Sequence, residues 1–388
     1  MNVKIPFVDL SLQHQPLEAQ LQQAIQNVLT KGDFILGQAL AEFETAFATA
    51  SGVEYGVGVA SGTDAIALGL QACNIGVGDE VILPVNTFVA TLIGILRTGA
   101  KPIFVDCDPK TALIDLEAAA KAVTPRTKAI VPVHLYGQMV SPQALLDFAH
   151  TYKLLIFEDA AQAHLAQREG YRAGSVGVAA AYSFYPSKNL GAFGDGGMLI
   201  TRDPEIAAKM RRLRNYGASQ KYVHLDFGTN SRLDTLQASV LQQKLPYLTQ
   251  WNSDRYTAAQ QYDLELTSLA SAGIIPIENH SGAGHIYHLY VIKIDSACSV
   301  NREQIQQHLT QAGIQTGVHY PIPCHLQPAF TNLGYQQGDF PQAEALAKQI
   351  LSLPMYPGLS HSQIKEVVAA ITSAMNAEKN LLLTEKSF

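Results

Sequence analysis

Short apolar runs alternate with helical patterns between residues 55 and 200. Each of the runs is long enough for one strand: "YGVGVA", "EVILP", "KPIFVD", "KAIVPVHLYG" and "KLLIFED". Helical periodicity follows the first four of them, as in "DAIALGLQAC" and "SPQALLDFAHTY". Continuous apolar strands that alternate with helices are typical of a mostly parallel sheet covered by helices. The pattern predicts an α/β fold in which ligands bind at the carboxyl ends of the strands.

The pattern becomes largely helical after "GGMLIT", and a long helical run from Arg232 into the 250s is interrupted near Pro246. Beyond that run, "HIYHLYVIKID" predicts a strand, "NREQIQQHLTQAG" a helix and "IQTGVHYP" a second strand. We therefore predict a large domain over 1–245 and a smaller α+β domain over 246–388. The helix predicted from "PLEAQLQQAIQNVLTKG" should pack near their junction.

Composition narrows the class of protein. Of the 388 residues, 47% are hydrophobic and 15% are charged, which fits a compact globular enzyme. The formal net charge of −6 offers no basic stripe for nucleic acid. The amino-terminal "MNVKIPFVDLSLQHQ" lacks the features of a signal peptide, and no apolar run reaches the length of a membrane span. Four scattered cysteines without metal-ligand spacing indicate reduced thiols in a cytoplasmic protein.

One lysine in a turn raises the first question of chemistry. "AYSFYPSKNLGAFGDGGMLI" (181–200) holds Lys188 between two apolar strands, five residues after Ser183. A lysine beside a core usually extends its ammonium to water, so the residue alone does not indicate catalysis.

Three further segments place polar or aromatic residues at strand ends. Gly62 and Thr63 open a helix, where backbone N–H groups and the helix dipole suit a phosphate, although an ordinary N-cap is the alternative. Asp159 and Gln162, three residues apart after a strand, could hold two heteroatoms of a flat ring. Phe88 begins another helix and could stack on such a ring, although a core position is its default. His164 has no second ligand at a metal-binding spacing, so we interpret it as structural and predict no metal.

These pieces together fit pyridoxal phosphate. This cofactor needs a lysine, a carboxylate for its pyridinium nitrogen, a partner for its ring hydroxyl, a phosphate cup and an apolar face. Desolvation would lower the pKa of Lys188 toward the neutral amine that the chemistry requires. We therefore predict that Lys188 lies in its turn to reach a ring held by Asp159.

The chain resembles the DegT/DnrJ/StrS family of pyridoxal-phosphate enzymes, chiefly nucleotide-sugar aminotransferases. The resemblance runs in order through "GDFILGQALAEFETAFA", "SGTDAIALGL", "GVGDEVILPVNTFVAT", "EDAAQAHLA", "SFYPSKNLGAFGDGGMLIT" and "GTNSRLDTLQAS". It implies the aspartate-aminotransferase fold (type I), a large mostly parallel-sheet domain plus a smaller α+β C-terminal domain.

The resemblance also implies roles for residues. Lys188 matches the family's Schiff-base lysine and the catalytic residue. The matching cofactor-binding residues are Gly62, Thr63, Phe88, Asp159, Gln162, Ser183, Lys188 and Asn230. Asn230 matches the residue that reaches the phosphate of the neighbouring subunit, which implies a homodimer with shared active sites. The glycines of "GAFGDGG" are interpreted as turn formers.

The substrate is predicted from "GIQTGVHYPIPCHLQPAF". Its "HYPxPxH" run resembles the sugar 3-aminotransferases of the family more than the 4-aminotransferases, and the proline-stiffened loop could present hydrogen-bonding groups. The matching substrate-binding residues are His319, Tyr320, Tyr185 and Lys221. Lys221 has the alternative of a solvated loop lysine. The resemblance thus implies conversion of a dTDP-3-keto-6-deoxyhexose to its 3-amino sugar, with L-glutamate as amino donor and 2-oxoglutarate as product.

Several alternatives stay open. A 4-aminotransferase acting on a dTDP-, UDP- or GDP-linked 4-keto-6-deoxyhexose would share most of these motifs. A non-catalytic sensor or regulatory protein that binds pyridoxal phosphate could keep the fold. A decarboxylase or racemase on the same scaffold is conceivable, whereas the dehydratases among the relatives have replaced the lysine that this chain retains at 188.

Overall fold

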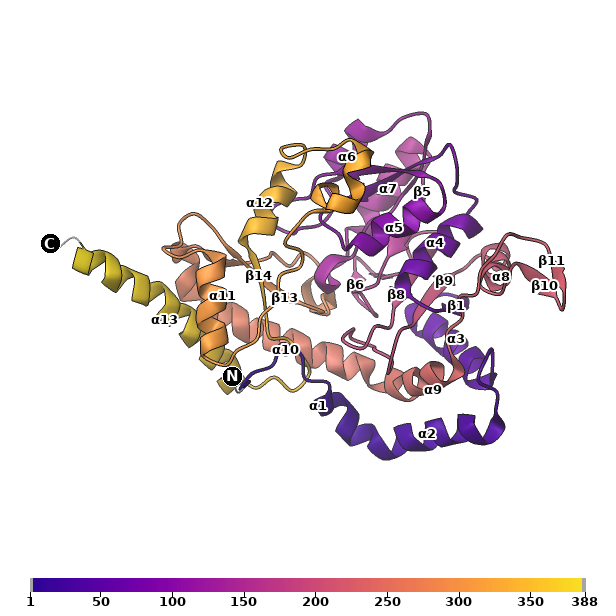
Figure 1. Ribbon diagram of the computed structural model, residues 1–388, viewed down its shortest axis with the longest axis horizontal. Coiled ribbons are helices and arrows are strands. Elements are labelled where there is room, and N and C mark those ends of the chain that lie inside the picture. The colour runs from indigo at the N-terminus through magenta and orange to yellow at the C-terminus, as the bar shows by residue number, and fades with distance from the viewer. Residues whose placement is uncertain (1–2, 386–388) are drawn as a thin grey trace.

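The computed structural model describes residues 3–385, with side chains described as far as residue 376. Its centre is a seven-stranded sheet in the order β1-β9-β8-β5-β4-β2-β3 (Figure 1). The strands are β1 (Tyr55–Val59), β2 (Glu80–Pro84), β3 (Lys101–Val105), β4 (Thr127–Ile130), β5 (Leu155–Asp159), β8 (Ala179–Ser183) and β9 (Gly197–Thr201). All neighbouring strands are parallel except β9, which runs antiparallel to both β1 and β8.

Helices cover this sheet, because its strands are apolar on both faces. They are α3 (Gln38–Ser51), α4 (Gly62–Ala72), α5 (Val89–Arg97), α6 (Leu116–Ala122), α7 (Pro142–Tyr152), α8 (Pro204–Leu213) and α9 (Thr235–Lys244). One core contains Ala179 and Ala181 and a second contains Ala180 and Tyr182, so alternate residues of β8 face opposite layers. The mostly parallel sheet confirms the predicted fold class.

A second group of elements follows residue 245. Its small antiparallel sheet has the order β12-β13-β14, with β12 at Ile274–Pro276, β13 at Tyr290–Ile294 and β14 at Ile350–Leu353. The helices are α10 (Leu248–Leu266), α11 (Arg302–Gln311), α12 (Pro341–Gln349) and α13 (His361–Glu385). The apolar cluster of this region spans 258–375 and also includes Ile5. Ile5 joins the amino terminus to this second region, while Val291 and Leu346 of the same region belong to the core of the large sheet.

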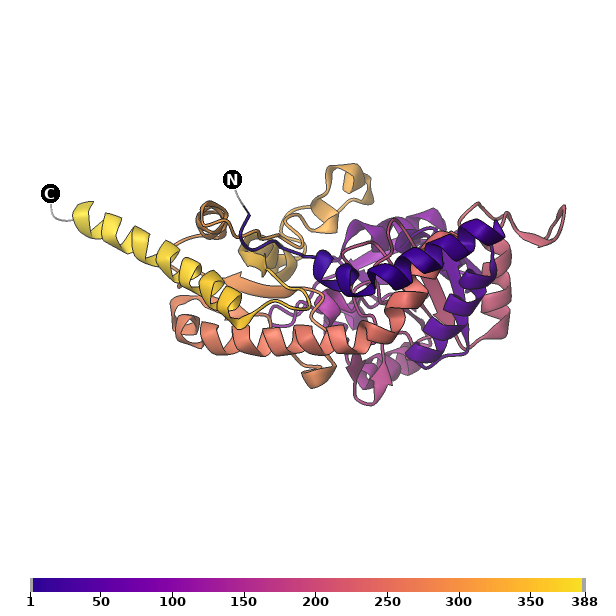
Figure 2. The same ribbon diagram turned by 90° about the horizontal axis from the view of Figure 1, so that it is seen from below.

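Two segments extend from the body of the molecule. The hairpin of β10 (Ala218–Gln220) and β11 (Val223–His224) lies at one end, and α13 at the other (Figures 1 and 2). The amino-terminal α2 (Glu18–Lys31) follows the short α1 (Ser11–His14) and packs on α9 beside Trp251 of α10. The predicted interruption near Pro246 is a short 3-10 turn, Leu245–Tyr247, between α9 and α10. No helix within 3–385 is long and apolar enough to cross a membrane.

One predicted strand is wrong. "IQTGVHYP" forms isolated bridges, Ile5 with Ile314 and Gly317 with Ser352, and no continuous ladder. The backbone of this segment is bonded by side chains as well, since the Tyr136 hydroxyl donates to the His319 carbonyl oxygen at 2.6 Å. The strand predicted from His285 is also shorter, because Ile286 and Leu289 donate to the carbonyls of Gly137 and Tyr136 before β13 begins.

Candidate active site

A cavity of about 340 Å³ opens at the carboxyl ends of the central strands. The predicted residues that line it are Gly62, Thr63, Phe88, Asp159, Gln162, Ser183, Tyr185, Lys188, His319 and Tyr320. The fold therefore gathers residues that lie up to 258 positions apart in the chain into one cavity. Lys221 and Asn230 do not line it.

The amino terminus of α4 forms one corner of the cavity. Ser61 caps the helix by accepting a hydrogen bond from the Asp64 N–H at 3.1 Å, and the first-turn N–H groups of a helix have no partner within the helix. A Cβ at Gly62 would lie 2.8 Å from the Cβ of Ser183, so only glycine lets β8 approach this closely. The corner thus combines helix N–H groups with the hydroxyls of Thr63 and Ser183, which suits a phosphate.

Gly197 also allows two backbone segments to approach closely. A Cβ there would lie 2.3 Å from the carbonyl carbon of Ser61, so β9 can pass the start of α4 only as glycine. Its φ is not positive. This glycine of "GAFGDGG" is thus required for close approach, whereas the sequence predicted a turn.

Asp159 ends β5 with its carboxylate buried and held on both oxygens. The Thr91 hydroxyl donates to Oδ2 at 2.7 Å, and the Ala161 N–H donates to Oδ1 at 3.1 Å. The hydroxyls of Thr87 and Thr91 are themselves hydrogen-bonded at 2.8 Å. Burial raises the pKa of Asp159, while these donors and the positive charge of Lys188 oppose that rise. The carboxylate can accept a further hydrogen bond from a ring N–H.

Lys188 follows the end of β8 in the predicted turn, and its N–H donates to the Tyr185 carbonyl oxygen at 2.9 Å. The surrounding protein lowers the pKa of its ammonium from 10.5 to about 8, and the charge of Asp159 opposes this shift. A substantial fraction of Lys188 is therefore a neutral amine near pH 8. A neutral amine is the form that attacks a carbonyl carbon and accepts a proton from carbon.

Gln162 and two aromatic rings complete the inner wall. The Gln162 side-chain oxygen accepts from the Tyr136 N–H at 2.7 Å, and its amide nitrogen donates to the Tyr320 hydroxyl at 3.0 Å. Phe88, the N-cap residue of α5, is 51% exposed and lies 5.3 Å from Tyr320 between ring centroids. Phe88 is therefore not a core residue, and its ring is free to stack on a flat ligand.

Glu158, the neighbour of Asp159 in β5, has a different environment. It accepts hydrogen bonds at 2.8 Å from the backbone N–H groups of Gly174, Val176 and Gly177 and lies 2.8 Å from His134 Nε2. The His134 ring accepts from the Val140 N–H through Nδ1, so Nε2 carries the proton and donates to Glu158. Glu158 is thus a fully satisfied structural anchor.

His164 is structural as well. It is buried, and its Nε2 donates to the carbonyl oxygen of Ser183 at 2.9 Å. Burial lowers the pKa of its imidazole to about 3, and the charge of Lys188 adds to that effect. The ring therefore stays neutral, and its hydrogen bond supports the backbone of Ser183.

The predicted substrate residues divide into two groups. His319 and Tyr185 lie at the cavity with Tyr320, and His319 Nδ1 lies 2.9 Å from the Ser352 hydroxyl. Burial lowers the pKa of His319 to about 4, so this imidazole is neutral. Lys221, by contrast, is exposed at the β10–β11 hairpin with its ammonium 5.2 Å from the Tyr222 ring, and Asn230 is exposed after the hairpin.

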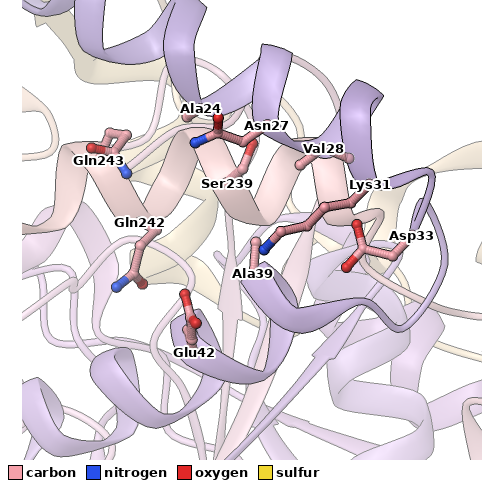
Figure 3. Close-up of a pocket in the computed structure, with 10 residues that line it drawn as sticks. All are labelled: Ala24, Asn27, Val28, Lys31, Asp33, Ala39, Glu42, Ser239, Gln242 and Gln243. Carbon is pink, nitrogen blue, oxygen red and sulfur yellow. The ribbon is translucent and has the colours of Figure 1, made fainter.

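A smaller hollow lies between α2, α3 and α9 (Figure 3). It has a volume of about 120 Å³ and is lined largely by polar residues, among them Lys31, Asp33, Glu42 and Gln242. None of the predicted site residues lines it. Of these two cavities, the larger one therefore holds the predicted site residues.

Sequence patterns did not reveal several residues of the site. Thr87, Thr91 and His288 contribute to the cavity or to Asp159, and Asn189 supports His288. Thr91 had a weak signal, since it lies one helical turn after Thr87 on the helix that Phe88 opens. His288 and Asn189 had none, because these partners lie about a hundred residues apart.

The residues of the cavity fit pyridoxal phosphate. A crowded glycine and two hydroxyls surround the helix terminus, a donor-held carboxylate lies in the wall, and an amine with a lowered pKa stands opposite. Fold and site together define a pyridoxal-phosphate enzyme of the type I fold.

Comparison with known proteins agrees. The model of the DegT/DnrJ/EryC1/StrS aminotransferase family matches residues 15–372, and the chain belongs to this family. It is 45% identical to the erythromycin biosynthesis sensory transduction protein EryC1 of Saccharopolyspora erythraea, over 95% of this chain and 98% of that protein. It is 42% identical to a dTDP-3-amino-3,4,6-trideoxy-alpha-D-glucose transaminase of Streptomyces venezuelae, over 95% of both chains.

The solved structures give the same result. The crystal structure of S. venezuelae DesV in complex with a ketimine intermediate is 42% identical, covers 96% of this chain and 98% of its own, and superimposes with a TM-score of 0.91. The protein is accordingly a pyridoxal-phosphate-dependent aminotransferase, as the sequence predicted.

Proposed function

We propose that this enzyme transfers an amino group from L-glutamate to carbon 3 of a dTDP-linked 3-keto-6-deoxyhexose. The observation that carries the proposal is the pairing of Lys188 and Asp159 in one cavity that His319, Tyr320 and Tyr185 also line. The Streptomyces venezuelae relative, a dTDP-3-amino-3,4,6-trideoxy-alpha-D-glucose transaminase, supports the nucleotide and the position of amination.

The proposed work of each residue follows from its surroundings. Bound at this site, pyridoxal phosphate would supply an electron sink for the bond broken at the substrate carbon. Asp159 would keep the ring nitrogen protonated, and Gln162 would face the ring hydroxyl. The Gly62–Thr63 corner and Ser183 would hold the phosphate. Lys188, as the neutral amine, would bind the cofactor and move the proton between carbons.

The test is product analysis. Keto-sugar nucleotides that differ in base and keto position are incubated with enzyme and L-glutamate, and NMR locates the new nitrogen. We expect it on C3 of the dTDP sugar. Nitrogen on C4 would favour the 4-aminotransferase alternative, and turnover of none of the substrates would favour a binding protein of the kind that the name of EryC1 suggests.

The two half-reactions can be tested separately. His319→Ala should slow the sugar half-reaction and spare the glutamate half-reaction, since His319 lines the cavity and touches none of the proposed ring-binding side chains. Tyr320→Phe should slow the sugar half-reaction too, but it also removes the acceptor of the Gln162 amide, so His319→Ala is the cleaner variant. Equal slowing of both half-reactions by His319→Ala would contradict the assignment.

We further propose a cytoplasmic homodimer with shared sites. Asn230 and Lys221 are exposed and outside the cavity of their own chain, and the β10–β11 region leaves Phe227 95% exposed. A second copy of the chain would cover such apolar side chains. Mixing a Lys188→Ala chain with an Asn230→Ala chain should restore some activity through hybrid dimers. No restoration after demonstrated subunit exchange would contradict sharing.

A further inference from the structure

His288 lies just before β13 and lines the cavity. The proposed function gives it no role. The residue is 8% exposed. Its Nδ1 lies 3.2 Å from the Asn189 side-chain oxygen, and Asn189 directly follows Lys188. No protein group within the described side chains hydrogen-bonds to His288 Nε2. A deeply buried imidazole thus has one nitrogen occupied and the other open to the cavity.

A directional chain of hydrogen bonds decides which nitrogen carries the proton. The Asn189 amide nitrogen donates to the carbonyl oxygen of Ile286 at 3.0 Å and to the side-chain oxygen of Asn252 at 2.8 Å. The Asn252 amide nitrogen in turn donates to the His164 carbonyl oxygen at 2.9 Å. Backbone carbonyl oxygens can only accept, so they fix the orientation of both amides.

The orientation of Asn189 therefore turns its oxygen toward His288. An amide oxygen can only accept, so His288 Nδ1 must carry the hydrogen, and Nε2 keeps its lone pair. Burial lowers the pKa of His288 well below its ordinary value, and the positive charges of Lys188 and Arg255 add to that effect. The His288 imidazole is therefore neutral near pH 7. His288 consequently offers the cavity a hydrogen-bond acceptor.

The two substrates of the proposed reaction differ in what they could offer this acceptor. L-glutamate carries two carboxylates, which accept hydrogen bonds, and one amino group, which is the group transferred. A hexose carries hydroxyl groups, which can donate. A buried lone pair without a donor is unfavourable, so a substrate hydroxyl that reaches it is selected over a substrate that lacks one.

Building on the proposed function, we propose that His288 is a specificity residue for the sugar half-reaction. Its Nε2 accepts a hydrogen bond from a hydroxyl of the bound keto-sugar, and Asn189 holds the ring in the tautomer that permits this. Because Asn189 directly follows Lys188, this hydrogen bond would orient the hexose beside that lysine.

The first measurement compares His288→Asn with His288→Gln in the complete enzyme. Asparagine can still donate to Asn189 but places no acceptor where Nε2 stands, whereas glutamine can place its oxygen there. We expect His288→Asn to weaken binding of the dTDP-amino-sugar product about tenfold by calorimetry, as loss of one hydrogen bond predicts, and to leave dTDP binding unchanged. His288→Gln should recover part of that affinity. His150→Asn, an exposed histidine, is the control.

Single-turnover kinetics then compares the half-reactions. The sugar half-reaction of His288→Asn should slow, while the glutamate half-reaction should keep its wild-type rate. Unchanged product affinity, or equal slowing of both half-reactions, would overturn the assignment. If the wild-type enzyme aminates no keto-sugar, the proposed function itself fails, so the two failures are distinguishable.

The tautomer has a readout of its own. The imidazole ¹⁵N signals that disappear in His288→Asn should show a protonated Nδ1 and an unprotonated Nε2 in the wild-type protein, with no dependence on turnover. A protonated Nε2 would overturn the inference at its first step.

Discussion

Two lysines, the half-buried Lys188 and the buried Lys244, share a lowered pKa but differ in what surrounds them. Burial lowers the pKa of each from 10.5 to about 8. Lys188 lines the cavity and faces the carboxylate of Asp159. Lys244 is 1% exposed, donates to the Gly191 carbonyl oxygen and lies 3.2 Å from His14 Nε2, with no carboxylate partner among the described residues.

The difference shows that a lowered lysine pKa alone does not define a catalytic group. Both amines are desolvated, but only Lys188 has space for a reactant and a carboxylate opposite. Lys244 instead supports the loop that follows Lys188, because Gly191 lies three residues after it. The Phe193 ring of the same loop lies 5.8 Å from the Lys244 ammonium and 4.9 Å from the His14 ring.

The largest expected effect separates the two lysines by covalent trapping. Borohydride should fix pyridoxal phosphate on Lys188, and Lys188→Ala should abolish both the adduct and transamination, because Lys188 is the cavity lysine whose charge acts on Asp159. Lys244→Met should retain the adduct. Peptide mapping by mass spectrometry checks this, with circular dichroism to show that both variants fold. An adduct on Lys244, or none on the wild-type protein, would contradict the assignment.

The next effect removes the charge that distinguishes the cavity. Asp159→Asn should lower the rate of transamination by about 10²–10³-fold, since a neutral amide cannot hold a ring nitrogen protonated. The absorbance change on adding L-glutamate, followed by stopped flow, measures the first half-reaction. Thr87→Val is a milder comparison, because Thr87 reaches Asp159 only through Thr91. A wild-type rate in Asp159→Asn would show that the carboxylate is not needed.

The smallest effect concerns stability and depends on Lys244. The folded-state pKa of about 8 lies below the ordinary 10.5, so between these values the unfolded chain binds more protons. The penalty for burying this ammonium is complete below pH 8 and disappears as the pH rises toward 10.5. In the Lys188→Ala apoprotein, Lys188 no longer titrates. Its free energy of unfolding should therefore rise by at most about 3 kcal/mol between pH 8 and 10.5 because of Lys244.

The matched control adds Lys244→Met to Lys188→Ala, which should remove this part of the pH dependence. Urea unfolding of both apoproteins from pH 7.5 to 10 gives the comparison. Equal slopes in the two proteins would show that Lys244 is not the titrating group.

The sequence predicted the parts of the molecule that local patterns encode. Apolar strands followed by helices fixed the order of the large sheet's elements, and strand ends located Gly62, Phe88 and Asp159. Their convergence followed from the rule that ligands bind at the carboxyl edge of a parallel sheet. Family resemblance was needed for His319 and Tyr320, because the loop between α11 and α12 has no local signal that turns it toward the cavity.

What the sequence could not predict depends on partners distant in the chain. His288 pairs with Asn189 across 99 residues, and neither has a motif that marks the other. The strand expected from "IQTGVHYP" had a suitable apolar pattern, but Ile314 and Gly317 pair with different neighbours, so no ladder forms. The sequence around Lys244 is that of an ordinary helical lysine, and its burial depends on the contact between α9 and the loop at Gly191.

The adjacent acids of β5 show how a pleated strand separates tasks by one position. On one face of the strand, Glu158 has all its acceptor positions filled by donors, whereas Asp159 on the other face can still accept a hydrogen bond from a ligand. Because successive side chains point to opposite faces, an insertion of one residue upstream in β5 would exchange them. The two carboxylates are thus not redundant, because neither could take over the role of the other from its own position. Their order along the chain is itself a functional constraint.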